Sequence, residues 1–376
     1  MINMKYWKFI FILSNLVTLS LSSQKTEKEV NEKHITGNYE MLSHNNFERE
    51  YFVHSPKNYD ETIKVPLMLH FHGGAGDIAS AIGYSDMGSI SDANGFILVY
   101  PQALPEPGSN KSGGVWTYKD SSVARDVDNI GFVDRIIRIL ISNYNVDEDR
   151  VYASGFSNGG EFVFELACRM SDKIAAVGVV ARSMEIGVFT TCKPTYPVGV
   201  LSIHGTKDDY NGITFGGKIY YPSINDVNQF WVSHNDLNTI PKVIQLPDLA
   251  EYDGSTVEHY IWNNDDYIAV EHYKIINGGH DWPGSWGNMD IDASSIIWNF
   301  VKRFSRSELK TEINIARDSD GISVSTDTKE GQSYRIQASQ DLKQWSNEEV
   351  IQGDGSTKAV HRSSDQPKEF FRFVEE

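Results

Sequence analysis

The sequence predicts an α/β fold, in which helices cover both faces of a mostly parallel sheet, followed by a small C-terminal all-β module. Two observations carry this prediction. Near-continuous apolar runs of strand length alternate with segments of helical periodicity, a pattern typical of parallel strands that are buried on both faces. The helical patterns then stop near residue 305, and short alternating runs separated by glycine-containing turns follow.

The elements follow from these patterns in chain order. Buried strands are expected at residues 65–71, 95–100, 151–153, 175–181, 198–203 and 268–276. Residues 47–54 alternate only in part, which favours an edge strand. Helices are expected at residues 128–144, with Asp128 as the N-cap, and at 161–170 and 291–304. The runs at 321–328, 333–339 and 369–376, with a turn at 353–356, indicate a small β-sandwich.

The composition indicates which class of protein this is. Of the 376 residues, 40% are hydrophobic and 23% are charged, which is enough apolar material for a globular core. The formal net charge of −17 argues against nucleic acid and anionic membrane surfaces as partners.

The first 23 residues have the features of a secretory signal. Lys5 and Lys8 precede an apolar stretch, residues 9–21, that is short for a membrane span, and small serines follow. We expect export with cleavage and no stable membrane insertion afterwards; an uncleaved anchor is the alternative. The expected organisation is a signal peptide (1–23), a flexible lead-in (24–36), a main domain (37–304) and the β module (305–376).

Cys168 and Cys192 are the only cysteines. An even count in an exported chain suggests one disulfide, and two buried free thiols are the alternative.

Ser157 lies in the pentapeptide Gly-Phe-Ser-Asn-Gly, residues 155–159, between an expected strand and an expected helix. This context is typical of a nucleophile elbow, and the N–H of Asn158 at the helix start is then an oxyanion donor. A glycine-serine turn without chemistry is the alternative.

A second glycine-rich loop, His-Gly-Gly-Ala-Gly at residues 72–76, follows the strand at 65–71. It predicts a second oxyanion donor at Gly74 or Ala75. Its spacing does not fit a phosphate-binding loop. His70 and His72 are weak metal candidates because no acidic or cysteine partner stands at ligand spacing. We therefore expect neither a metal nor an organic cofactor.

A serine nucleophile needs a base and an orienting carboxylate, and in this context the order is serine, acid, histidine. Asp208 and His280 both follow expected strands in that order, where catalytic groups of such sheets gather. Asp209 remains a competitor of Asp208. The competing downstream histidines are His204, His234, His259 and His272.

The segments GFSNGG, HGTKD and GGHDWPG, together with HGGAG, resemble the polyhydroxybutyrate-depolymerase and feruloyl-esterase-like family of α/β-hydrolases, related to carbohydrate esterase family 1. The resemblance covers residues 37–304. It implies that Ser157 is the nucleophile, Asp208 orients the base, His280 is that base, and Cys168 pairs with Cys192. Family members often continue the HGT-x-D segment with a valine-proline-tyrosine turn, whereas residues 209–212 read DYNG here. We therefore expect the geometry of this loop, and with it the choice of substrate, to differ from that of such family members.

The resemblance implies an exported serine esterase that acts without a cofactor on feruloyl or acetyl esters of polysaccharides, or on a polyester. Trp116, Trp282 and Trp286 are candidates to line the acyl or sugar pocket, with core packing as the alternative for Trp116. A serine peptidase on the same fold and a non-catalytic secreted polymer-binding protein are the rival functions. The C-terminal module either binds polymer or spaces the enzyme.

Overall fold

The structure is a computed structural model. It describes residues 26–27, 35–105, 113–116, 127–209, 211–215, 218–264, 268–309, 314–317, 321–328, 333–339, 346–354, 356–363 and 370–375. The expected signal peptide lies outside the described residues, as does most of the expected lead-in.

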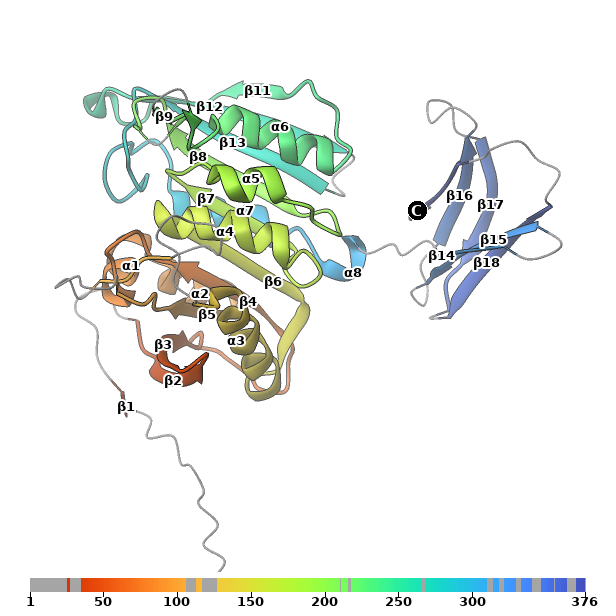
Figure 1. The fold of residues 1–376 in the computed structure, drawn as a ribbon, viewed down its shortest axis with the longest axis horizontal. Coiled ribbons are helices and arrows are strands. Elements are labelled where there is room, and N and C mark those ends of the chain that lie inside the picture. The colour runs from red at the N-terminus through yellow and green to blue at the C-terminus, as the bar shows by residue number, and fades with distance from the viewer. Residues whose placement is uncertain are drawn as a thin grey trace, which may run out of the picture.

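An 11-stranded sheet forms the centre of the main domain (Figure 1), in the order β1-β2-β3-β5-β4-β6-β7-β8-β13-β12-β11. Six neighbouring strands, from β5 to β13 in that order, run parallel. Their bounds are Ile97–Pro101 (β5), Val65–Phe71 (β4), Val146–Phe156 (β6), Ala176–Val180 (β7), Gly199–Gly205 (β8) and Ile268–Ile276 (β13). The predicted α/β class with a mostly parallel sheet is therefore confirmed.

Antiparallel strands flank the parallel centre on both sides. They are β1 (Thr26–Glu27), β2 (Asn38–His44) and β3 (Phe47–His54) on one side, and β12 (Thr256–Asn264) and β11 (Lys242–Gln245) on the other. The prediction that residues 47–54 form an edge strand is wrong, because β3 pairs with both β2 and β5. β2 gives little sequence signal, since Leu42 is its one buried residue.

The helices include α1 (Ile78–Ser85), α2 (Met87–Asn94), α3 (Asn129–Asn143), α4 (Asn158–Arg169), α5 (Ile186–Thr191), α6 (Ile224–His234), α7 (Ala293–Val301) and α8 (Arg306–Leu309). A 3-10 turn, η1 (Glu251–Asp253), precedes β12, and β9 (Thr214–Phe215) pairs with β10 (Lys218–Ile219). Asp128 caps α3 as predicted, since its side chain accepts a hydrogen bond from the N–H of Gly131. Among the described helices, none has the length and apolar character to cross a membrane.

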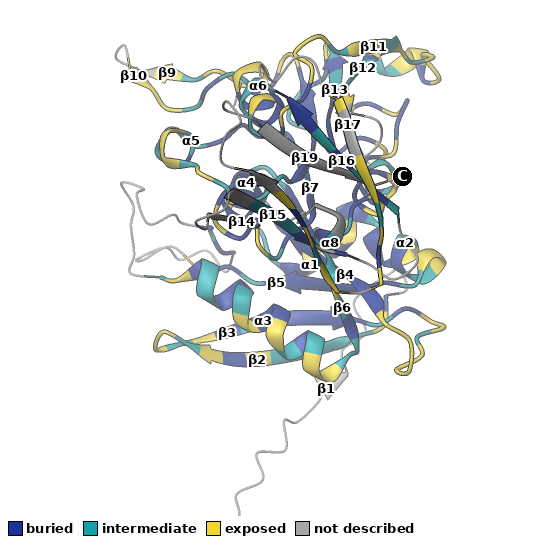
Figure 2. Cartoon of the chain, turned by 90° about the vertical axis from the view of Figure 1, so that its right-hand side faces the viewer, coloured by how far each residue is buried: buried dark blue, intermediate teal, exposed yellow. Residues whose placement is uncertain are grey.

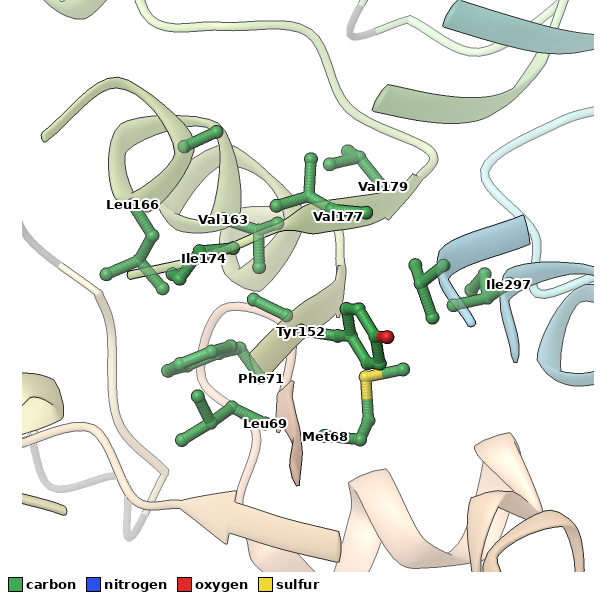
Figure 3. Packing of buried hydrophobic residues seen from close by; sticks show 14 of the residues in the cluster. Met68, Leu69, Phe71, Tyr152, Val163, Leu166, Ile174, Val177, Val179 and Ile297 are labelled. Atoms are coloured by element: carbon green, nitrogen blue, oxygen red, sulfur yellow. The ribbon is translucent and has the colours of Figure 1, made fainter. Parts of the chain in front are cut away.

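Helices bury apolar side chains against both faces of the central strands. Figure 3 shows Val163 and Leu166 of α4 on one side of β6 and β7, and Ile297 of α7 on the other. All three side chains are fully buried; burial of one such side chain contributes about 1.5–3 kcal/mol. In Figure 2 the central strands are drawn as buried, whereas α3 carries exposed residues along its outer side. The sheet is therefore covered by helices on both faces, as the continuous apolar runs predict.

The C-terminal residues form two small antiparallel sheets, β14-β15-β18 and β17-β16-β19. Their strands are Asn314–Arg317 (β14), Gly321–Asp327 (β15), Ser333–Ser339 (β16), Ser346–Gln352 (β17), Thr357–Ser363 (β18) and Phe370–Glu375 (β19). The three runs that the sequence singled out correspond to β15, β16 and β19.

Arg306, at the start of α8, is buried against the main domain. Its guanidinium donates hydrogen bonds to the carbonyl oxygens of Ile174 and Pro197, each at 2.8 Å. These carbonyls stand two residues before the starts of β7 and β8, so α8 packs as part of the main domain. A division of the chain after Leu309 therefore keeps this contact, whereas a division at residue 305 breaks it.

Candidate active site

Ser157 occupies a sharp turn between β6, which ends at Phe156, and α4, which begins at Asn158. Its backbone has φ +52° and ψ −123°, a conformation that costs a non-glycine residue about 1–3 kcal/mol. The N–H of Ser157 donates to the carbonyl of Val180, and its own carbonyl accepts the first bond of α4 from the N–H of Glu161. These bonds hold the strained residue at the N-terminus of the helix.

Gly159 allows α4 to approach the neighbouring strand. A Cβ atom at this position would lie 2.3 Å from the carbonyl oxygen of Phe71, the last residue of β4. No side chain can occupy that space, so only glycine permits the approach. The second glycine of the pentapeptide therefore sets the distance between the serine turn and the loop that follows β4.

The structure brings the side chains of Ser157, His280 and Asp208 within hydrogen-bond distance of one another, with His280 in the middle. His280 Nε2 lies 2.9 Å from Ser157 Oγ, and His280 Nδ1 lies 2.9 Å from Asp208 Oδ2. The Asp208 side chain is fully buried, whereas 32% of the His280 side chain is exposed. In the tautomer with the proton on Nδ1, His280 donates to the carboxylate and accepts from the serine hydroxyl.

The loops that carry Asp208 and His280 are joined by hydrogen bonds. The N–H of Lys207 donates to the carbonyl of Gly278, and the N–H of Asn277 donates to Thr206 Oγ1. A Cβ atom at Gly205 would lie 2.3 Å from the carbonyl oxygen of Gly278, so glycine is required at the end of β8. Backbone contacts therefore fix the carboxylate and the imidazole relative to each other.

The competing residues lie elsewhere, with one exception. Asp209 is exposed. The ring nitrogens of three competing histidines contact other groups: His234 lies at the carbonyl of Tyr196, His259 at Glu271, and His272 at Ser202. The exception is His204, whose Nε2 lies 2.9 Å from Asp208 Oδ2. The sequence offered no signal for that contact.

The glycine-rich loop after β4 lies beside the serine turn. A Cβ atom at Gly74 would lie 3.4 Å from Asn158 Cβ, which places this part of the loop opposite the first residue of α4. Ala75 has a left-handed backbone, with φ +56°, and its carbonyl packs closely against Gly113. The expected oxyanion donors, the N–H groups of Asn158 and of Gly74 or Ala75, thus come from two segments in contact.

Residues 53–191 match the model of a family described as Esterase PHB depolymerase. This match supports the esterase family that the sequence motifs resemble. The bifunctional acetylxylan esterase/xylanase XynS20E of Neocallimastix patriciarum is 27% identical over 261 residues, covering 68% of this chain and 33% of that protein. Feruloyl esterase B of Piromyces equi is 26% identical over 267 residues, covering 68% of this chain and 45% of that protein. The chain thus spans less than half the length of either relative.

A solved structure, the acetyl xylan esterase from Aspergillus awamori, matches with a TM-score of 0.50 and 16% identity. The match covers 70% of this chain and 99% of that chain. This likeness supports the α/β fold of the main domain.

Both ring nitrogens of His72 take part in hydrogen bonds beside the glycine-rich loop. Its Nε2 accepts a hydrogen bond from the N–H of Ala103, and its Nδ1 donates to the carbonyl of Gly73. Burial lowers the pKa of His72 to about 4 and that of His70 to about 3. Both imidazoles are neutral near pH 7, and both serve the packing around the loop.

Two of the three tryptophans expected in the substrate pocket are core residues instead. Trp116 is fully buried, stacks on Phe162 with ring centroids 5.0 Å apart, and donates from Nε1 to the carbonyl of His72. Trp282 is 1% exposed and donates to Ser294 Oγ. These side chains have almost no surface for a substrate, so the prediction is wrong for both.

Trp286 remains as the candidate that a substrate can reach, because it is 37% exposed. Its ring meets Phe156 edge to face, with centroids 5.5 Å apart, and Tyr84 in the same way at 5.6 Å. The Phe156 ring lies 5.0 Å from the imidazole of His280. We call Tyr84, Phe156 and Trp286 the aromatic wall; it stands next to the expected base.

The side chain of Asn158 has a role that the sequence did not indicate. Its Oδ1 accepts from the N–H of Trp116 at 2.8 Å, and its Nδ2 donates to the carbonyl of Trp116 at 3.1 Å. The amide thus fastens the segment at 113–116 to the start of α4. The earlier expectation assigned only the backbone N–H of Asn158 a function.

A buried ionic cluster lies one turn further along α4. Arg182 donates to Glu161 Oε2 at 2.7 Å and to the hydroxyl of Tyr221 at 2.5 Å, and that hydroxyl donates to Glu161 Oε1. Burial and the neighbouring Glu161 raise the pKa of Tyr221. The cluster ties the elbow helix to the segment that follows β10.

Cys168 and Cys192 form the predicted disulfide, with Cα atoms 5.3 Å apart. It joins α4 to the C-terminal end of α5. The alternative of two free thiols is therefore wrong.

Proposed function

We propose that the chain is a serine carboxylic-ester hydrolase that works through an acyl-enzyme. The observation that carries the proposal is the placement of His280, whose two ring nitrogens lie 2.9 Å from Ser157 Oγ and from Asp208 Oδ2. A hydroxyl, an imidazole and a buried carboxylate in this relation are the groups that acyl transfer needs.

In the acylation step, Ser157 Oγ attacks the ester carbonyl carbon while His280 Nε2 takes the hydroxyl proton. Asp208 holds the Nδ1–H tautomer and stabilises the imidazolium that forms. The tetrahedral intermediate then collapses, and His280 delivers the proton to the oxygen of the leaving alcohol. The acyl group remains on Ser157.

In the deacylation step, a water molecule takes the place of the alcohol. His280 removes its proton, the hydroxide oxygen attacks the acyl carbon, and the carboxylic acid leaves as Ser157 regains its proton. In both steps, the negative oxygen is stabilised by the N–H of Asn158 and an N–H of the Gly74–Ala75 segment. Each such donor contributes about 3 kcal/mol to the transition state.

The substrates that we propose are feruloyl or acetyl esters of a polysaccharide, with a polyester as the further member of the class. The support comes from relatives named for acetylxylan and feruloyl esters, and from a family described by polyester depolymerisation. The exposed ring of Trp286 beside His280 suits an aromatic acyl group or a sugar ring. We also propose that the protein is exported, which accords with its disulfide.

The test compares the wild type with Ser157→Ala on p-nitrophenyl acetate, then on methyl ferulate, acetylated xylan and polyhydroxybutyrate. We expect the wild type to hydrolyse at least one ester and Ser157→Ala to lose about 10⁴-fold or more in kcat with an unchanged fold. Ser154→Ala, three residues earlier on β6, is the matched control and should keep its kcat.

The same panel is run with the chain ended after Leu309, which reports whether the β module contributes on polymers. A wild type that binds polysaccharide but hydrolyses no ester would contradict the proposal in favour of a polymer-binding protein. Peptides that are cleaved faster than esters would favour a peptidase.

A further inference from the structure

We propose that His204 is a positioning residue that holds the carboxylate of Asp208 for the triad. This inference rests on the proposed function, because it assigns a role behind the same active site. His204 Nε2 lies 2.9 Å from Asp208 Oδ2, and both side chains are fully buried. His280 Nδ1 reaches the same oxygen from the other side, also at 2.9 Å.

Two imidazoles therefore share one carboxylate oxygen, with different surroundings. His280 is partly exposed and faces Ser157, whereas His204 is closed off from solvent. A buried carboxylate without enough donors is costly, because it loses its hydration without a replacement. An Nε2–H on His204 places a further positively polarised group against Oδ2. Rotation of the carboxyl group that breaks the bond to His280 would also lose this contact.

The fold presents His204 to Asp208 through a tight turn. His204 lies in β8, which ends at Gly205, and the chain reverses so that the N–H of Asp208 points to the carbonyl of Gly205 at 3.3 Å. The two side chains meet four residues apart without a helix between them. His204 Nε2 is close to Oδ2 but off the axis of a linear hydrogen bond; such bonds commonly tighten when the substrate binds.

A cavity lies beside His204, and the surroundings of the ring permit the tautomer that this role requires. The cavity has a volume of about 210 Å³, and its lining includes His204, Thr206, Asn211, His272 and Lys274. Neither ring nitrogen of His204 has a partner in hydrogen-bond geometry among the described residues, so no acceptor other than Asp208 competes for a proton on Nε2. Nε2–H is then free to serve Asp208.

The inference predicts a specific kinetic signature. His204→Leu removes the donor but keeps an apolar side chain of similar reach, and we expect kcat on p-nitrophenyl acetate to fall by roughly 10- to 100-fold. This is the range for loss of one hydrogen bond to a charged group. KM should stay within about threefold, because the residue does not reach the substrate. His204→Gln restores an N–H donor and should recover most of the lost kcat.

His272→Leu is the matched control. His272 lines the same cavity and is also buried, but its Nδ1 lies 2.8 Å from Ser202 Oγ. Its loss should change the melting temperature about as much as His204→Leu does, while kcat stays within about threefold of the wild type. A fall in kcat that is equal in both variants would overturn the inference in favour of general destabilisation.

A double-mutant cycle with Asp208→Asn decides whether His204 acts through the carboxylate. We expect His204→Leu to cost no further kcat in the Asp208→Asn background. Losses that multiply in the cycle, or an unchanged kcat in the single His204→Leu variant, would overturn the inference and leave the esterase proposal standing. A wild type without esterase activity would contradict both the inference about His204 and the proposed function.

Discussion

The imidazole of His280 lies 2.9 Å from the hydroxyl of Ser157, although 123 residues separate them in the chain. The parallel sheet produces this contact: β6 and β13 both end at the same edge, and each residue follows its strand by a few positions. The loop after β8 brings Asp208 to the same edge. The proposed chemistry therefore depends on strand order more than on any local motif.

The two neighbouring aspartates should differ sharply in their effect on catalysis. We expect Asp208→Asn to lower kcat by about 10⁴-fold, because the amide no longer holds the Nδ1–H tautomer of His280. Asp209→Asn should keep kcat within about threefold, since that side chain is exposed. Steady-state kinetics on p-nitrophenyl acetate measure both, and equal losses in the two variants would contradict the assignment.

The aromatic wall should discriminate between acyl groups. Trp286→Ala removes the exposed ring, so we expect KM for methyl ferulate to rise by about tenfold, as one lost ring contact of about 1–1.5 kcal/mol implies. KM for p-nitrophenyl acetate should change less than about twofold. Trp286→Phe keeps a ring and should retain most of the ferulate preference. A parallel change on both esters would show that the wall does not contact the acyl group.

Buried neutral histidines should make the fold sensitive to acid. Burial lowers the pKa of His70 to about 3, of His72 to about 4 and of His272 to about 3, whereas the unfolded chain takes up these protons near pH 6.5. The unfolded state therefore binds more protons below that pH, and the free energy of unfolding falls as the pH drops. At pH 5 each histidine contributes a loss of about 2 kcal/mol.

Urea unfolding at pH 7 and pH 5 checks this prediction. His70→Asn keeps a hydrogen-bonding side chain opposite Ser154 but cannot titrate, so this variant should lose about 2 kcal/mol less than the wild type between the two values. An equal loss in both proteins would show that His70 does not carry the effect.

The disulfide should stabilise the main domain. Replacing Cys168 and Cys192 together by alanine opens a loop with a sequence separation of 24 residues, and we expect a loss of about 3 kcal/mol in the free energy of unfolding. Urea midpoints with and without reductant measure it. Reductant should lower the midpoint of the wild type and leave that of the double variant unchanged; a shift in neither would contradict the prediction.

The sequence predicts the parallel centre of the sheet well because burial on both faces leaves unbroken apolar runs. β4 and β13 have the bounds that those runs indicate. The flanking strands are harder, since they have few buried residues: Leu42 in β2, and Val257 and Trp262 among the described side chains of β12. β3 lies inside the sheet because it pairs with β2. The sequence pattern of residues 47–54 does not indicate that a further strand pairs there.

The candidate site shows the same division. Ser157, Asp208 and His280 each follow a strong strand signal, so their meeting at one edge of the sheet is predictable from order alone. The burial of Trp116 and Trp282, the side-chain role of Asn158 and the contact between His204 and Asp208 depend on how loops fold back. Those contacts join residues through turns, and composition and periodicity carry no information about them.

The anchoring of Arg306 has a practical meaning for engineering. Its guanidinium donates hydrogen bonds to the carbonyls of Ile174 and Pro197, at the edge of the sheet where β7 and β8 start. Ser157, Asp208 and His280 instead follow the ends of their strands. The helix α8, which ends at Leu309, therefore lies near the edge of the sheet opposite to Ser157. A binding module or a surface linker fused after Leu309 would therefore be joined near the edge of the sheet opposite to Ser157.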